Sequence, residues 1–160
     1  IAMQSSLTGH LVFSTVHSND TVSAVYRLYD LDIRPYLIAT SVRAIIAQRL
    51  VRRLCSNCCE PYDPTEEELE KLGMDRDKVG QLYRADGCEK CNDTGYRGRT
   101  GVFELLELND QMQNLIQQEP SIPQLRRAAR KAGLVPMRQD AMVKAVMGVT
   151  SLEEALRITG

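Results

Sequence analysis

The sequence predicts an α/β fold with an inserted tetracysteine subdomain and a helical C-terminal region. Three observations predict it: an apolar run at Leu11–Val16 followed by helical patterns, two Cys-x-x-Cys pairs in mid-chain, and successive helices from Asn109 onward. The chain has 160 residues, of which 43% are hydrophobic, so it can bury a sizeable core as one domain or as two small units. We expect three segments: 1–54, 55–101 and 102–160.

The first segment is expected to form a strand followed by two helices. Leu11–Val16 is short, apolar and partly β-branched, which favours a strand buried on both faces of a parallel sheet. Ser18, Asn19 and Asp20 supply N-cap side chains for the next helix. Pro35 fits the first turn of a second helix, which we expect to reach about Ala47. The inward faces of the two helices are expected to carry Val22, Val25, Leu28, Tyr29, Leu37, Val42, Ile45 and Ile46.

The rest of the chain is expected to be extended around the cysteines and helical at the end. Thr65–Glu68 is a capping box that opens a short acidic helix to about Leu72. Extended segments are expected at Gln48–Leu54 and Val102–Leu108. The later helices are predicted over Asp110–Gln118, Ile122–Ala132, Pro136–Met147 and Leu152–Ile158, with Ser151 and Glu154 as a second capping box and Gly133 and Gly148 as C-caps.

Four cysteines have the spacing of a structural metal site. Cys55 and Cys58 form one Cys-x-x-Cys pair, and Cys88 and Cys91 form another. Two thiolates of one tight turn can reach the same ion, so two pairs complete the closed tetrahedral shell that structural zinc prefers. Disulfides are the alternative, but nothing resembles a signal peptide and a chain of this size needs no covalent staples. We interpret the adjacent Cys59 as a bystander.

The charge balance excludes a strong global field. The chain has 20 basic and 21 acidic residues, so nothing draws it as a whole toward nucleic acid or anionic lipid. Basic residues nevertheless gather near both cysteine pairs. They either compensate the formal charge of minus two on a four-thiolate zinc centre or form a binding surface, and the sequence leaves both open. The apolar runs are too short to span a bilayer, so membrane association requires a partner.

The two histidines are candidates for chemistry. His17 follows the predicted strand at its carboxyl end, where ligands bind in open α/β sheets, whereas His10 lies at the other end. The alternative is that His17 is structural and that Ser18–Asp20 only cap a helix. The chain contains no G-x-x-x-x-G-K-[ST] phosphate loop and no acidic strand end for magnesium. We therefore expect this chain alone to lack ATPase activity.

Taken together, several motifs resemble the secretion ATPase superfamily, in its type II secretion and type IV pilus assembly branch. The segment Thr8–Asp20 resembles the histidine box of that branch. The other matching segments are Leu50–Cys55, Gly87–Cys91, Gly95–Gly101 and Thr150–Leu156. The departures are Ser18, where threonine is usual, and Cys59, where lysine is common. The resemblance covers essentially the whole chain, and Gln4–His10 looks more like the secretion branch.

The resemblance implies the C-terminal part of a RecA-like ATPase that powers assembly of a pilus or pseudopilus. The chain would begin just after the Walker B strand. His10 and His17 would face the phosphates of ATP bound with magnesium in the parent enzyme, and Cys55, Cys58, Cys88 and Cys91 would hold zinc. The implied partners are other copies in a homo-hexamer and the cytoplasmic domains of inner-membrane secretion or pilus platform proteins. The implied location is the cytoplasm, peripheral to the bacterial inner membrane.

A function of another class also fits part of the sequence. The segment from Cys88 to Gly95 is similar to C-x-x-C-x-G-x-G knuckles of zinc-dependent modules that bind protein or nucleic acid, although Asp93 replaces the first glycine. With two Phe, six Tyr and no Trp, the chain offers few platforms for base stacking. A stand-alone zinc-binding module is therefore the alternative, with nucleic acid disfavoured as its ligand.

Overall fold

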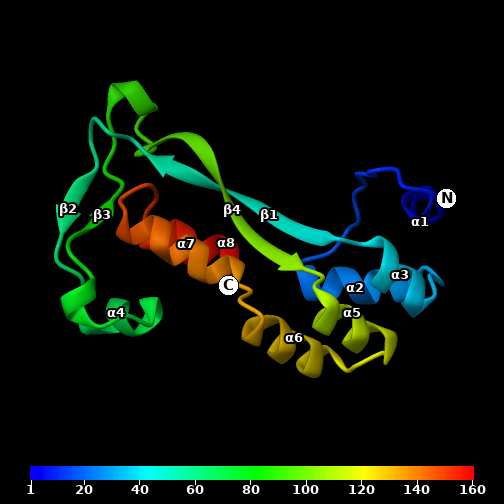
Figure 1. The fold of residues 1–160 in the computed structure, drawn as a ribbon. Coiled ribbons are helices and arrows are strands. Elements are labelled where there is room, and N and C mark those ends of the chain that lie inside the picture. The colour runs from blue at the N-terminus through cyan, green and yellow to red at the C-terminus, as the bar shows by residue number, and fades with distance from the viewer. The chain divides into compact units, whose positions relative to one another are not determined.

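The structure, a computed structural model, describes residues 1–160 (Figure 1). The chain divides into two compact units. The first unit comprises Ile1–Ala47 and Glu104–Pro136, and the second comprises Gln48–Phe103 and Met137–Gly160. Strands β1 (Ala44–Leu54) and β4 (Tyr96–Glu107) form a two-stranded sheet, and each strand belongs partly to both units. The division of the chain into segments 1–54, 55–101 and 102–160 remains a prediction.

The first unit is helical and packs around one core. Its helices are α1 (Ala2–Leu7), α2 (Thr21–Asp30), α3 (Pro35–Ser41), α5 (Asp110–Gln117) and α6 (Ile122–Lys131). The core residues are Val22, Val25, Ile38, Ala39, Leu106, Leu108, Met112, Ile116, Leu125 and Ala129. The helix after Asp20 is confirmed, because the Asp20 carboxylate accepts a hydrogen bond from the Ser23 backbone N–H at 2.6 Å.

The predicted strand at Leu11–Val16 is wrong. This segment has no regular secondary structure, and Leu11 and Phe13 are 80% and 88% exposed. A strand persists only where a neighbouring strand satisfies its backbone groups, and no strand of this chain pairs with residues 11–16. His17 therefore does not sit at the end of a strand here.

The second predicted helix is shorter than expected. It ends at Ser41 rather than near Ala47, and Ile45 and Ile46 belong to β1. The carbonyl of Arg43 accepts a hydrogen bond from the backbone N–H of Leu108 at 2.9 Å, so pairing with β4 begins here. Two successive β-branched residues fit a strand better than a helix, and this long-range pairing overrides the helical periodicity.

The second unit combines the cysteine segment with the last two helices. Its elements besides parts of β1 and β4 are β2 (Glu60–Tyr62), α4 (Glu66–Leu72), the 3-10 turns η1 (Arg76–Lys78) and η2 (Glu89–Cys91), β3 (Leu82–Arg84), α7 (Met137–Val146) and α8 (Leu152–Thr159). Strands β2 and β3 pair antiparallel, with Pro61 opposite Tyr83. The capping box of Thr65 and Glu68 is confirmed, and α7 packs on α8. None of the helices has the length and apolar character needed to cross a membrane.

Candidate functional site

The four cysteines are presented by two short turns. Cys55 follows β1, and its carbonyl accepts the N–H of Cys58 at 3.2 Å. Cys88 precedes η2, and its carbonyl accepts the N–H of Cys91 at 3.1 Å. Asn92 then reverses the chain in the left-handed conformation, with φ of 53°. Each turn thereby places two sulfurs on the same side of the backbone, as the spacing predicts.

The four sulfurs converge at the separations that one tetrahedral ion requires. All four lie within 4.8 Å of one another, and none is in a disulfide. The sulfur–sulfur distances are 3.9 Å for Cys55 and Cys88, 3.8 Å for Cys58 and Cys91, and 3.7 Å for Cys88 and Cys91. Ligands about 2.3 Å from one metal ion at tetrahedral corners lie about 3.8 Å apart. The group therefore fits a single metal ion, and Cys59 is not part of it.

Backbone N–H groups favour negative charge in this cluster. Burial raises the pKa of the Cys91 thiol, but hydrogen bonds from the backbone of Cys88 and Gly95 outweigh it and lower the pKa to about 6. Burial and thiol hydrogen bonds to its three neighbours raise the pKa of Cys58 to about 12. Without a cation the cluster resists full ionisation, whereas a divalent ion stabilises all four thiolates together.

Gly95 joins the two turns and has no room for a side chain. Its N–H donates to the Cys91 sulfur at 3.2 Å, and its carbonyl accepts the N–H of Cys55 at 2.9 Å. Its φ is +71°, and a Cβ at this position would lie 2.5 Å from Cβ and 2.9 Å from Cα of Ala85. Only glycine can adopt this positive φ and also leave room for the close approach to Ala85.

An exposed amide and lysine contact the cluster from outside. Lys90 Nζ donates to Asn57 Oδ1 at 2.8 Å, which directs the Asn57 amide nitrogen toward the Cys88 sulfur at 3.5 Å. A pocket of about 300 Å³ beside Cys55 is bordered by Lys90 and two further cations, Arg53 and Arg97. Charge compensation of the thiolates and anion binding both remain compatible with this arrangement.

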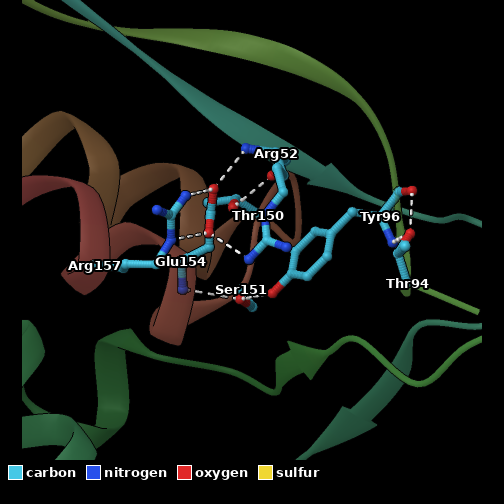
Figure 2. A network of polar contacts seen from close by, with 7 residues as sticks. All are labelled: Arg52, Thr94, Tyr96, Thr150, Ser151, Glu154 and Arg157. Carbon is cyan, nitrogen blue, oxygen red and sulfur yellow. Dashed lines mark hydrogen bonds and ion pairs between the residues drawn. The ribbon is translucent and has the colours of Figure 1, made fainter.

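A buried carboxylate anchors this region to the C-terminal helix (Figure 2). Glu154 of α8 is 0% exposed and accepts hydrogen bonds from Arg52 Nη2 at 2.7 Å and from the Arg52 backbone N–H at 3.0 Å. Arg157 Nε and Nη2 complete its shell, each at 2.8 Å. These contacts, led by the hydrogen bonds from Arg157, lower the pKa of Glu154 to about 2. The predicted capping box at Ser151 and Glu154 is therefore only half formed: the Ser151 hydroxyl caps α8, but the Glu154 side chain turns to the arginines.

The same network reaches both cysteine turns. Arg52 lies in β1 just before Cys55, and its guanidinium stacks 4.0 Å from the ring centre of Tyr96. Tyr96 directly follows Gly95, and its hydroxyl contacts the Ser151 hydroxyl at 2.6 Å (Figure 2). The network thus connects the start of α8 to the strand residue three positions before Cys55 and to the residue that follows Gly95. The sequence analysis did not identify the contact of Glu154 with Arg52, because the spacing of Ser151 and Glu154 is that of a local capping box.

The two histidines lie in an exposed segment of the first unit. His10 contacts the Thr8 hydroxyl through Nδ1 at 3.1 Å, and His17 is exposed. His10 and His17 belong to the first unit, and the cysteines belong to the second. The Ser18 hydroxyl bonds the Asp20 carbonyl at 3.0 Å, so the segment leads directly into the cap of α2. The proposed role of His10 and His17 stays a prediction.

Sequence reasoning also missed a buried carboxylate at the start of α2. Glu104 is 7% exposed and accepts hydrogen bonds from the backbone N–H of Thr21 at 3.0 Å and from its hydroxyl at 2.5 Å. The signal was present in the predicted strand, because Val102, Leu106 and Leu108 alternate with exposed residues and place Glu104 on the same inward face.

Residues 1–157 match the family model described as "Type II/IV secretion system protein", so the chain belongs to that family. It is 47% identical over 159 residues to "Type II secretion system protein E" of Pseudomonas aeruginosa and, at the same identity, to "Type II secretion system ATPase E" of Vibrio cholerae. It is 41% identical over 160 residues to "Type IV pilus assembly ATPase TfpB" of Acinetobacter baylyi.

The alignments cover nearly all of this chain and a minor part of each relative. They include 99% of the chain but 32%, 31% and 27% of the three relatives in turn. The fold is also similar to the crystal structure of the pilus retraction motor PilT with bound ADP, with a TM-score of 0.63 and 20% identity, over 98% of this chain and 34% of that one. The chain therefore has the fold of one portion of that motor protein.

Proposed function

We propose that this chain is the C-terminal part of a hexameric ATPase that powers pseudopilus assembly in type II protein secretion. The observation that carries the proposal is the family match over residues 1–157. The higher identity to type II secretion ATPases, 47% against 41% for a pilus assembly ATPase, favours secretion. The whole enzyme would have a RecA-like core and would act on the cytoplasmic side of the bacterial inner membrane, held there by platform proteins.

The metal of this part is zinc, and its role is structural. Four thiolates at tetrahedral spacing leave no position for water or substrate, so the site has no Lewis-acid chemistry of its own. Zinc bound by Cys55, Cys58, Cys88 and Cys91 would join the two turns. The contacts of Gly95 and Glu154 then transmit that rigidity to β1, β4 and α8.

His17 is the phosphate-sensing residue of this part, with His10 in a secondary role. ATP with magnesium supplies the phosphoryl group in the whole enzyme, but this chain contains no phosphate loop to hold it. His17 can offer an N–H donor to a phosphate oxygen, and its exposure leaves that donor accessible. Asp20 caps α2 three residues later, so a displacement of His17 would be passed to that helix.

The test compares histidine variants in the full-length enzyme. We expect His17→Ala to lower the ATPase rate strongly while zinc content and ATP affinity stay close to wild type, and His10→Ala to have a smaller effect. The 160-residue chain alone should give no nucleotide binding by micromolar titration. A full-length enzyme without nucleotide-stimulated assembly beyond a dimer would contradict the hexameric ATPase.

The alternatives are separable by experiment. A type IV pilus assembly ATPase would restore twitching or piliation rather than secretion in a deletion strain. A stand-alone zinc-dependent binding module would retain a ligand as the isolated chain; a nucleic-acid ligand would be lost steeply as salt rises.

A further inference from the structure

The N-terminus of α2 is held by two carboxylates from distant parts of the chain. Asp20 Oδ1 accepts the N–H of Ser23 at 2.6 Å, and Glu104 Oε1 accepts the N–H and hydroxyl of Thr21. The first N–H groups of a helix have no partner within the helix, and its macrodipole favours negative charge there. Because Thr21 is fully buried and Glu104 nearly so, these bonds are shielded from water.

A third segment reaches the same helix end. Arg126 Nη2 of α6 pairs with Asp20 Oδ2 at 2.8 Å, and α6 packs against α2. Burial raises the pKa of Asp20, but the bonds to Ser23 and the Arg126 charge outweigh it, so the net pKa is lowered and the carboxylate stays ionised. We call Asp20, Thr21, Glu104 and Arg126 the α2 clamp. It joins the start of α2 to β4 and to α6.

The segment before the clamp has little support of its own. Residues 11–17 take part in no backbone hydrogen bond of the structure, and Leu11 and Phe13 are exposed. His17 lies three residues before Asp20, which limits their Cα separation to roughly 10 Å. Along the chain, the clamp is therefore the nearest set of residues to His17 that is bonded to other elements.

We propose that Glu104 and Arg126 are positioning residues for His17. They act through Thr21 and Asp20, so that a shift of β4 or α6 moves the segment that carries the imidazole. This inference rests on the proposed function of His17. A carboxylate and a guanidinium suit the role because charge-assisted bonds are short and directional, and because each comes from an element remote in sequence.

The first test uses Arg126→Gln in the full-length enzyme, with Arg127→Gln as the matched control. Arg127 is the next residue on the same helix, is exposed, and has no ion pair in the structure. We expect the Arg126 variant to lose on the order of tenfold in kcat with an unchanged KM for ATP, because a small displacement of a catalytic contact lowers turnover without affecting binding elsewhere. Arg126→Lys should restore part of the rate.

The second test uses Glu104→Ala and Glu104→Gln. The alanine variant should reduce kcat in the fraction of protein that circular dichroism shows to be folded. The glutamine variant should recover much of it, because its amide oxygen accepts the same two bonds from Thr21. If Glu104→Ala fails to fold, the Arg126 series decides alone.

The outcomes distinguish this inference from the function beneath it. If His17→Ala lowers kcat while the Arg126 and Glu104 variants keep the kcat of Arg127→Gln, the positioning role of the clamp is wrong and the role of His17 stands. If His17→Ala has the kcat of wild type, the proposed role of His17 is wrong, and so is the inference that Glu104 and Arg126 position it. A fall in kcat confined to Arg126, Glu104 and His17 supports the inference.

Discussion

The tetracysteine cluster and the histidine segment are held in different ways. Each cysteine turn is closed by its own backbone hydrogen bonds, and Gly95 adds an N–H to the Cys91 sulfur. Residues 11–17 have no such bonds, and the next residues along the chain that bond to other elements are those of the α2 clamp, which begins at Asp20. Local hydrogen bonds fix the geometry of the cysteine turns. A segment without such bonds can be positioned only by contacts that neighbouring parts of the chain make. The predictions below test this difference, beginning with the largest effect.

Removing the metal should have the largest effect. We expect Cys88→Ser, or chelation of the wild-type chain, to unfold the segment around Cys55 to Gly101, because apparent zinc binding free energies of structural sites are about 10–16 kcal/mol and contribute to folding. Amide hydrogen exchange should rise in that segment and stay unchanged in α2 and α5. Metal analysis should fall from one zinc per chain to none.

Cys59→Ser is the control for this experiment. Cys59 is outside the four-sulfur group, so its replacement should leave zinc content and hydrogen exchange unchanged. If Cys59→Ser released the metal as Cys88→Ser does, the assignment of ligands would be wrong.

Removing the carboxylate of Glu154 should come second. Glu154→Ala removes the acceptor of the Arg52 backbone N–H and of the Arg52 and Arg157 guanidiniums, and we expect a cost of about 3 kcal/mol, the low end for a buried pair because both guanidiniums are about half exposed. Chemical denaturation should show this loss in the second unit. Because Arg52 lies three residues before Cys55 in the sequence, zinc should also leave the variant faster when a chelator is added. An unchanged unfolding midpoint would contradict the anchoring role.

The same carboxylate predicts a pH dependence. The pKa of Glu154 is lowered to about 2 in the folded state, so its contribution to stability is complete above its unfolded pKa of about 4.3 and is lost as pH falls toward 2. Wild type should therefore lose more stability over this range than Glu154→Gln. Both proteins are measured with zinc bound, so that acid release of the metal affects the two equally and cancels in the difference.

The sequence was informative where structure is local and less so where it is not. The caps at Asp20 and Thr65, the helices after Asn109 and the cysteine turns are set by residues within four positions, and all were predicted. The end of α3 and the state of Leu11–Val16 depend on whether a second strand lies alongside, which local pattern does not report. Glu104 and Glu154 were missed as anchors because Thr21 and Arg52, the residues that they join to their own elements, lie 83 and 102 residues away.

Substituting Gly95 should have a moderate effect on the metal centre and on the stability of the second unit. In Gly95→Ala the new Cβ would meet the backbone of Ala85, and a left-handed conformation costs a non-glycine residue roughly 1–2 kcal/mol before any clash. We expect faster zinc release and a loss of about 2–3 kcal/mol of stability in the second unit. Gly98→Ala is the matched control, since Gly98 has φ of +78° with no atom within 4 Å of a Cβ. Equal effects of the two variants would show that conformation, and not contact with Ala85, governs the site.

The smallest effect concerns the cap of α2, where two variants separate the two bonds of Asp20. Asp20→Ala removes the acceptor for the Ser23 N–H and the partner of Arg126, so it should cost about 1 kcal/mol of stability in the first unit. Asp20→Asn keeps an N-cap oxygen and loses only an ion pair whose Arg126 side chain is 43% exposed, so its cost should be a few tenths of a kcal/mol.

Because the pKa of Asp20 is lowered in the folded state, the stability that this carboxylate adds is complete above about pH 4 and is lost as pH falls further. Asp20→Asn should not show this loss. Thermal unfolding at neutral and acidic pH measures both. If Asp20→Asn proved as unstable as Asp20→Ala at neutral pH, the pairing with Arg126 rather than the cap would hold the start of α2, and the histidine segment would depend on α6 more than on its own helix.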